Sequence, residues 1–300
     1  MATEQGNIIL WGNNATCPFV QRVSICLKEK KIPFEIKGVN LSDKEGSIEF
    51  LSLYETLFPK SKKSPVTPLL QHILPTTQVL LTESDIILNY IEDNFNQDGC
   101  KNLMPVNAID RAAIRMFIHL FSTDILPCVR KIILGNDEES LIAVVDQIFN
   151  GYDTLNDFLV TQKERCSTST STYISSNASG IGPFVLGSEF TLAESVIAPH
   201  IQRLRLMPMI STIRPQLASL LMQHTNAYNI ESKATPATDD SDSDEDEEHD
   251  PLLTVCKLCF PALYQWHVAV LKRPSVVNTF KHNEVKTAIE KALVPWKGKN

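Results

Sequence analysis

Cys17 is the residue of this sequence with the clearest capacity for chemistry. The apolar run Asn7–Trp11 predicts a strand, residues 13–16 predict a turn, and Pro18 stands at the first position of a predicted helix, where proline is favoured. A thiol at a helix N-terminus faces unpaired backbone N–H groups and the positive end of the helix dipole, which stabilise the thiolate. The thiolate is the nucleophile in thiol–disulfide exchange. Position alone weighs this role evenly against that of an inert buried cysteine.

The spacing around Cys17 excludes a dithiol mechanism. A dithiol oxidoreductase needs a second cysteine three residues further on, and that position holds Val20. Cys26 lies further along the same predicted helix and is interpreted as a core residue. A redox-active Cys17 would therefore act alone. Because a single thiol cannot resolve its own mixed disulfide, a soluble thiol such as glutathione must do so.

Other potential ligands and thiols carry weaker signals. The pair Cys256 and Cys259 has the CxxC spacing, but it stands in a helical pattern with no second pair nearby, so core cysteines are favoured over a zinc or redox site. Three histidines also fall in helical patterns and are interpreted as packed or surface residues: His119, His200 and His267. No metal site is predicted.

The elements that must position Cys17 occupy about the first 97 residues. Their predicted order is strand, helix, strand, helix, strand, strand, helix, which is typical of a thioredoxin-like α/β domain. The predicted strands are Asn7–Trp11, Phe34–Val39, Val66–Gln71 and Gln78–Leu81, and the predicted helices are Cys17–Lys31, Ile48–Leu57 and Ser84–Phe95. Pro33 ends the first helix, and lysines in its last turn suit the helix dipole.

The rest of the chain changes character after a linker. Its periodic segments are helical, and strand patterns are absent: Ala108–Leu126, Glu138–Gln162, Thr191–Leu206 and Leu252–Leu271. Two low-complexity stretches interrupt it, the Ser/Thr-rich 166–179 and the polar to acidic 229–250, which is expected to be disordered. The sequence therefore predicts a domain over residues 1–97 and an all-helical domain over 106–300.

Charge, hydropathy and cysteine usage exclude several classes of protein. The net charge is −7, but nine acidic residues between Asp239 and Asp250 account for it, and no basic face indicates nucleic-acid binding. No run reaches the roughly 18 apolar residues of a membrane span, and residues 1–6 do not resemble a signal peptide. The seven scattered cysteines are typical of a reduced protein, so a cytoplasmic location is expected.

Several segments resemble one known family. Residues 17–23, CPFVQRV, resemble the active-site segment of omega-class glutathione transferases and plant dehydroascorbate reductases. Further segments follow in the order that this family has: VTPLL at 66–70, TESDI at 82–86, GSEFTLAE at 187–194 and KRPSV at 272–276. Within GSEFTLAE, Thr191 and Glu194 also form a predicted capping box ahead of an apolar helix. Together the segments cover most of the chain apart from its two low-complexity stretches.

The resemblance implies a glutathione transferase fold and a set of glutathione-binding residues. Cys17 would be the catalytic nucleophile, with Phe19 beside it. The Thr67–Pro68 bond is expected to be cis, which would present the backbone of Thr67 to the main chain of glutathione. Ser84 as an N-cap would leave helix-end N–H groups for the γ-glutamyl carboxylate, and Glu83 would accept the ammonium group.

A lysine is expected to meet the glycyl carboxylate of glutathione. Lys44 matches the position of the family's lysine, but the stretch after it is longer than in the family. The alternatives are Lys60, Lys62 and Lys63.

The activity that the resemblance implies is glutathione-dependent thiol transfer and dehydroascorbate reduction, with some conjugation of electrophiles. Glutathione would be the cosubstrate, with no bound cofactor and with a small disulfide or electrophile in a cleft between the domains. A homodimer is compatible with the family. Two alternatives remain open: a non-enzymatic glutathione-binding scaffold, and a chloride-channel-like relative. Against the latter, the helix after Cys17 carries several charged residues and makes a poor membrane span.

Overall fold

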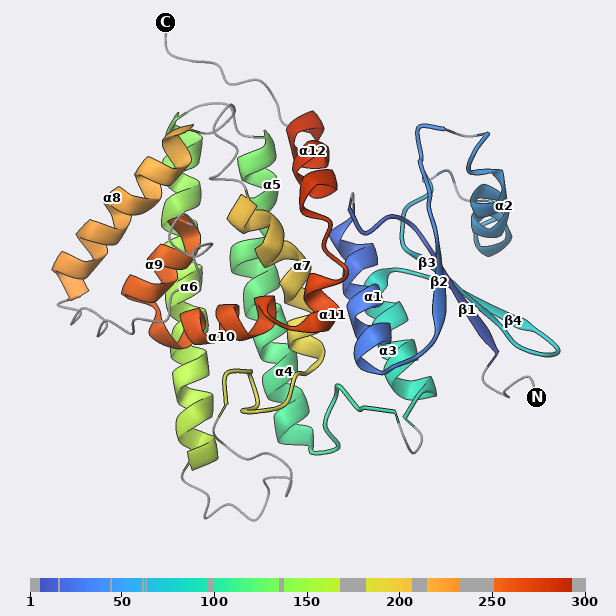
Figure 1. The fold of residues 1–300 in the computed structure, drawn as a ribbon, viewed down its shortest axis with the longest axis horizontal. Coiled ribbons are helices and arrows are strands. Elements are labelled where there is room, and N and C mark those ends of the chain that lie inside the picture. The colour runs from blue at the N-terminus through green and yellow to red at the C-terminus, as the bar shows by residue number, and fades with distance from the viewer. Residues whose placement is uncertain are drawn as a thin grey trace, which may run out of the picture. The chain divides into compact units, whose positions relative to one another are not determined.

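The computed structural model describes residues 6–15, 17–43, 45–60, 62, 64–96, 100–134, 138–167, 182–206, 215–232 and 251–292. The chain divides into two compact units (Figure 1). The first unit is Met1–Met104 together with Pro274–His282, and the second is Pro105–Arg273 together with Asn283–Asn300. Of the two low-complexity stretches, residues 168–181 and 233–250 lie outside the described residues, whereas 229–232 form the end of a helix.

A four-stranded mixed sheet forms the centre of the first unit. The strands are β1 (Asn7–Trp11), β2 (Phe34–Lys37), β3 (Leu69–Ile73) and β4 (Gln78–Thr82), and their order in the sheet is β2-β1-β3-β4. β1 pairs in parallel with β2, and it pairs antiparallel with β3 with Leu10 opposite Leu70. β3 and β4 form an antiparallel hairpin. The carboxyl end of β1 and the start of β3 therefore meet at the same edge of the sheet.

Helices cover both faces of this sheet (Figure 1). Helices α1 (Pro18–Glu29) and α3 (Ser84–Asn94) pack on one face, and α2 (Ile48–Leu57) packs on the other. Side chains alternate between the faces along a strand. On the α2 side, Trp11 and Leu69 accordingly form a core cluster with Phe50 and Tyr54. This arrangement confirms the expected thioredoxin-like domain.

A segment from the far end of the chain completes the first unit. The short helix α11 (Pro274–Val277) contacts α1, and the segment runs antiparallel to that helix. Gln21 Nε2 donates to Thr279 Oγ1 at 3.3 Å, and Ser275 Oγ donates to Glu29 at 2.5 Å. All four side chains are buried. The helix that follows Cys17 thus packs against residues more than 240 positions away in sequence.

The second unit is helical over its described residues, as expected. Its helices are α4 (Ala108–Leu120), α5 (Leu126–Leu134), α6 (Glu138–Ser167), α7 (Leu192–Leu206), α8 (Pro215–Ser232), α9 (Pro251–Cys259), α10 (Pro261–Leu271) and α12 (His282–Ala292). Among the described residues, one helical stretch, Ala108–Val129, reaches the length and mean hydropathy of a membrane span. Length and composition are weak evidence, because core helices of globular proteins meet the same criteria.

The expected helix 108–126 continues to Leu134 through a π-helical turn. This turn, Phe121–Ile125, joins α4 to α5 directly before Pro127. A proline lacks the N–H of the helical ladder, and its ring crowds the carbonyl four residues earlier, so a locally wider turn relieves the conflict. Within the turn, the Asp124 carbonyl accepts a hydrogen bond from Gln147 Nε2 at 2.9 Å. The helical conformation therefore continues from α4 into α5 past Pro127.

Two other helices differ from expectation. The predicted helix 252–271 is divided, because Phe260 leaves the helical conformation immediately before Pro261, which begins α10. Helix α8 was not predicted, since its apolar residues follow the helical period weakly and its end merges with the polar segment at 229.

The predicted capping box is present at the start of α7. Glu194 is completely buried, and its Oε2 accepts from the Thr191 N–H at 2.7 Å and from Thr191 Oγ1 at 2.5 Å. Its Oε1 accepts from the Val185 N–H and from Trp266 Nε1, each at 2.9 Å. Glu194 therefore joins the loop before α7 to α10 as well as capping its own helix.

Candidate active site

Cys17 lies at the N-cap position of α1, between the turn after β1 and Pro18. Asn13 fixes this turn: its Oδ1 accepts from the Ala15 N–H at 2.8 Å, and its carbonyl accepts from the Cys17 N–H at 3.0 Å. Among the hydrogen bonds of the described residues, the Cys17 side chain makes no capping bond to its own helix, and it is partly exposed. Cys17 therefore lies, partly exposed, at the positive end of a helix.

The sulfur of Cys17 faces the residue that precedes a cis peptide bond. Thr67–Pro68 is cis, as the sequence predicted, and Cys17 Sγ lies 3.8 Å from the Thr67 carbonyl oxygen. Thr67 and Pro68 immediately precede β3, which is antiparallel to β1. The sheet thus brings the predicted nucleophile and the predicted main-chain contact together from positions 50 residues apart.

Gly12 allows α1 to approach the end of β1 closely. Its φ angle is +145°, and a Cβ atom at this position would lie 2.4 Å from Val20 Cγ2. Val20 is completely buried, so it cannot move into solvent. We expect Gly12→Ala to lower the free energy of unfolding by about 1–3 kcal/mol and to displace the start of α1. Chemical denaturation measures the first effect, and the rate of Cys17 alkylation measures the second.

Gly38 is the matched control for this prediction. Within 4 Å of a Cβ atom at Gly38 there is no atom of the described part of the chain, so Gly38→Ala should leave both measurements close to native. A Gly12→Ala protein as stable as the Gly38→Ala protein would contradict the close-approach argument.

The four buried cysteines of the described residues are poor nucleophiles. Burial raises the pKa of the Cys26 thiol well above its ordinary value, with the charge of Glu92 adding to the effect. Burial also raises the pKa of Cys128 and of Cys259 to about 11. Cys256 is buried, with its sulfur 3.3 Å from His267 Nδ1. Burial lowers the pKa of that histidine to about 3, so it stays neutral at pH 7 and cannot stabilise a thiolate as a cation.

The second part of the site is the start of α3. Glu83 precedes the helix at its N-cap position with a φ angle of +63°, and Ser84 is the first helical residue. Ser84 was expected to be the N-cap itself. Its buried hydroxyl does not cap the helix but accepts a hydrogen bond from Arg22 Nη2. Glu83 is exposed, so its carboxylate can meet a cation from solvent.

Arg22 is a site residue that the sequence analysis missed. Its guanidinium lies 5.0 Å from the centre of the Phe19 ring and makes an ion pair with Asp85 at 2.9 Å. Burial lowers the pKa of Arg22, while the charges of Asp85, Cys17 and Glu83 act to raise it. Arg22 was within the family-like segment 17–23, but its partners lie more than 60 residues away in sequence. Only the fold reveals this connection.

The lysine proposed for the glycyl carboxylate is not identified by the structure. Lys44 and Lys63 lie outside the described residues. Lys60 and Lys62 are described and exposed. The choice among the four stays a prediction.

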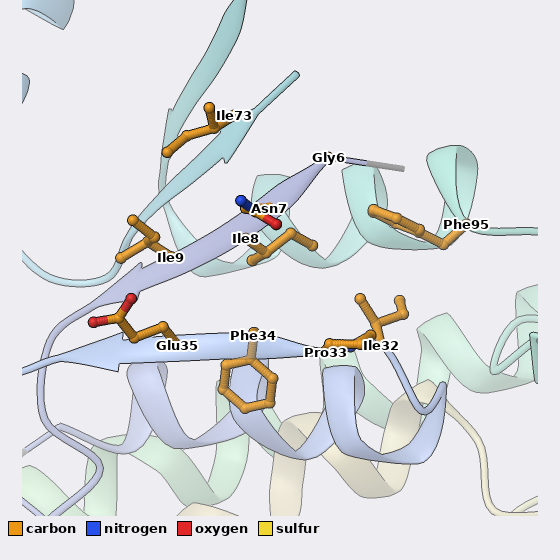
Figure 2. A pocket seen from close by; sticks show the side chains of 10 residues that line it. All are labelled: Gly6, Asn7, Ile8, Ile9, Ile32, Pro33, Phe34, Glu35, Ile73 and Phe95. Atoms are coloured by element: carbon orange, nitrogen blue, oxygen red, sulfur yellow. The ribbon is translucent and has the colours of Figure 1, made fainter. Parts of the chain in front are cut away.

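A cavity of about 410 Å³ in the first unit does not belong to this site. Figure 2 shows it between the beginnings of β1 and β2, with Ile73 at the end of β3 and Phe95 after α3. Cys17 follows the opposite end of β1, and Thr67 precedes the opposite end of β3. The cavity therefore lies at the far edge of the sheet from the thiol.

The main-chain groups around Cys17 suit an extended peptide chain. The backbone at Thr67 offers main-chain hydrogen-bonding groups beside the nucleophilic sulfur. The start of α3 offers a helix N-terminus for a carboxylate, and Glu83 offers a negative charge for an ammonium group. The first unit therefore combines a partly exposed cysteine with groups that complement the charges of an amino-acid end.

Sequence comparison connects this unit to a known family. Residues 16–94 match the family model described as "Glutathione S-transferase, N-terminal domain". That range contains Cys17, Thr67, Pro68, Glu83 and Ser84. No curated protein matches the chain.

Solved structures resemble the chain over almost its whole length. Glutathione transferase Omega 3C from Trametes versicolor has 21% identity and a TM-score of 0.56, with 93% of this chain and 91% of that chain covered. The tau-class glutathione S-transferase from mango, Mangifera indica, has 19% identity and a TM-score of 0.60, with 95% and 97% covered. Ure2p in complex with glutathione has 13% identity and a TM-score of 0.56, with 93% and 100% covered.

These likenesses concern the fold of the chain, and the family match concerns its first unit. The expected fold class is thereby confirmed, whereas the omega or dehydroascorbate-reductase subclass is a finer assignment. The chain has the fold of the glutathione transferases, with the N-terminal domain of that family at residues 16–94.

Proposed function

We propose that this protein is a glutathione-dependent thiol transferase that uses Cys17 as its nucleophile. The observation that carries the proposal is the position of Cys17, which is partly exposed at the start of α1 with its sulfur 3.8 Å from the carbonyl oxygen of Thr67. The N-terminal family match and the glutathione transferases with a similar fold support glutathione as the thiol. The omega-like segment at 17–23 favours a cysteine over a hydroxyl nucleophile.

The reaction would proceed through two exchanges. The Cys17 thiolate attacks the glutathionyl sulfur of a mixed disulfide, which forms a Cys17–glutathione disulfide and releases the substrate as a thiolate that takes up a proton. The thiolate of a second glutathione then attacks the glutathionyl sulfur on Cys17. This step forms glutathione disulfide and returns the Cys17 thiolate. Overall, the sulfur of one free glutathione is oxidised to the disulfide level as the substrate sulfur is reduced to a thiol, and the glutathionyl sulfur stays at the disulfide level throughout.

Binding of the tripeptide would use the groups described above. The backbone of Thr67, held by the cis bond to Pro68, would pair with its main chain, and Phe19 would lie beside its sulfur. Ser84 and the start of α3 would receive the γ-glutamyl carboxylate, and Glu83 would receive the ammonium group. Lys44, or one of Lys60, Lys62 and Lys63, would receive the glycyl carboxylate.

The test is to trap the first exchange. The native protein, treated with one equivalent of a glutathione mixed disulfide, should gain the mass of one glutathionyl group, and peptide mapping should place it on Cys17. Added glutathione should then remove it, with glutathione disulfide as the product. Glutathione binding without any adduct or turnover would favour the scaffold alternative. Insertion into lipid vesicles without glutathione binding would favour the channel-like alternative.

A further inference from the structure

Arg22 is a charged side chain held almost completely out of solvent in the first unit. Its exposed fraction is 6%, whereas its ion-pair partner Asp85 is 71% exposed. Nη2 contacts both Ser84 Oγ and Asp85 Oδ1, and Nε is buried with no hydrogen-bond partner among the residues that the structure describes. A buried guanidinium donor without a partner carries a cost in desolvation free energy, so its place in the fold needs an explanation.

The contact with Arg22 determines whether the Ser84 hydroxyl can donate a hydrogen bond to a ligand or accept one from it. A guanidinium has donors and no acceptor, so Ser84 Oγ must accept in this hydrogen bond. The hydroxyl proton of Ser84 then remains to be donated elsewhere. A ligand group next to Ser84 must therefore accept a hydrogen bond, which a carboxylate does well and an ammonium group cannot do.

The charges around Arg22 also favour a carboxylate at the start of α3. Asp85 pairs with Arg22 directly, so its negative charge is offset before a ligand arrives. The positive end of α3 adds a field that favours an anion at the same place. Glu83 precedes the helix and is exposed, so it remains available to a cation. The start of α3 thus offers separate positions for the carboxylate and the ammonium group of an amino acid.

We propose that Arg22 is a positioning residue that fixes the Ser84 hydroxyl as a hydrogen-bond donor and makes the start of α3 selective for a carboxylate. This inference rests on the proposed function, because the carboxylate in question is that of the γ-glutamyl residue of glutathione. Arg22 acts through Ser84 and the local charge, and it determines the specificity of the site for its ligand.

The test measures ligand selectivity in several variants. Isothermal titration gives the Kd of glutathione and of an analogue whose γ-glutamyl carboxylate is replaced by a primary amide. The native protein should bind glutathione at least about 30-fold more tightly than the amide. In Arg22→Gln that ratio should fall below about 5-fold. Arg115→Gln, which changes an exposed arginine of the second unit, should keep the native ratio.

Asp85→Asn is the second variant, and its site is exposed, so folding is not at risk. Loss of the Asp85 charge leaves Arg22 without its carboxylate partner, so the preference for the carboxylate ligand should rise by about 3-fold or more. A native ratio retained in Arg22→Gln overturns the inference. If Arg22→Gln does not fold, a ratio in Asp85→Asn that is unchanged or lower overturns it. Failure of the native protein to bind either ligand would instead overturn the proposed function.

Discussion

Replacing Cys17 by serine is expected to lower glutathione-dependent reduction of a mixed disulfide by about 1,000-fold or more. A serine hydroxyl is not ionised near neutral pH and cannot form the mixed disulfide on which the proposed cycle depends. The buried thiols of the first and second units cannot replace it, because burial disfavours their thiolates. Steady-state rates with a small mixed disulfide and with dehydroascorbate measure the effect.

Cys100→Ser is the matched control for this prediction. Cys100 is also partly exposed and belongs to the first unit, but it lies beyond α3 and away from the start of α1. Its replacement should leave both rates within about 2-fold of native. Equal conjugating activity in the native protein and in Cys17→Ser would transfer the chemistry to a hydroxyl group and refute the proposed mechanism.

Glu194→Ala is expected to destabilise the second unit by about 4 kcal/mol or more. The change removes the acceptor of four hydrogen bonds, from Val185, Trp266 and both donors of Thr191. Each donor then stays buried without this acceptor, at a cost of about 1–3 kcal/mol. The start of α7 also loses its reciprocal cap. Denaturant unfolding followed by tryptophan fluorescence measures the effect, because Trp266 is one of the donors.

Two variants distinguish the loss of the buried hydrogen bonds to Glu194 from the effect of removing a carboxylate in general. Glu290→Ala removes an exposed glutamate from α12 and should change the free energy of unfolding by less than about 0.5 kcal/mol. Glu194→Gln keeps the shape but replaces one acceptor oxygen by a donor amide, so an intermediate loss is expected. A Glu194→Ala protein as stable as Glu290→Ala would show that the four donors find other partners.

The features that the sequence predicted are those that depend on neighbouring residues. A turn followed by Cys17 and Pro18 specifies the start of α1, because the proline fixes the first helical φ angle. Thr191 and Glu194 are one turn apart and form the capping box by local geometry. The order of strands and helices in the first unit likewise follows from hydrophobic periodicity within each segment.

The features that the sequence did not predict depend on pairing across the fold. In the sequence, Arg22 is one of several charged residues of α1, and its contacts with Ser84 and Asp85 arise only from the fold. Ser84 was expected to cap α3 because serine favours the N-cap position. Glu83 holds that position, and the Ser84 hydroxyl accepts a hydrogen bond from Arg22. In the π-helical turn before Pro127, the Asp124 carbonyl accepts a hydrogen bond from Gln147, which lies on a different helix. Local propensity carries no information on such partners.

The contact between α1 and the segment Pro274–His282 bears on the order in which the chain can fold during synthesis. Ser275 and Thr279 are synthesised more than 240 residues after their partners Glu29 and Gln21, which lie on the helix that begins after Cys17. A nascent chain that has only reached Met104 would have its strands and Cys17 but not the residues that cover this side of α1. The helix that begins after Cys17 therefore gains its complete packing only after residues 274–282 have been synthesised, long after the strands of the same unit.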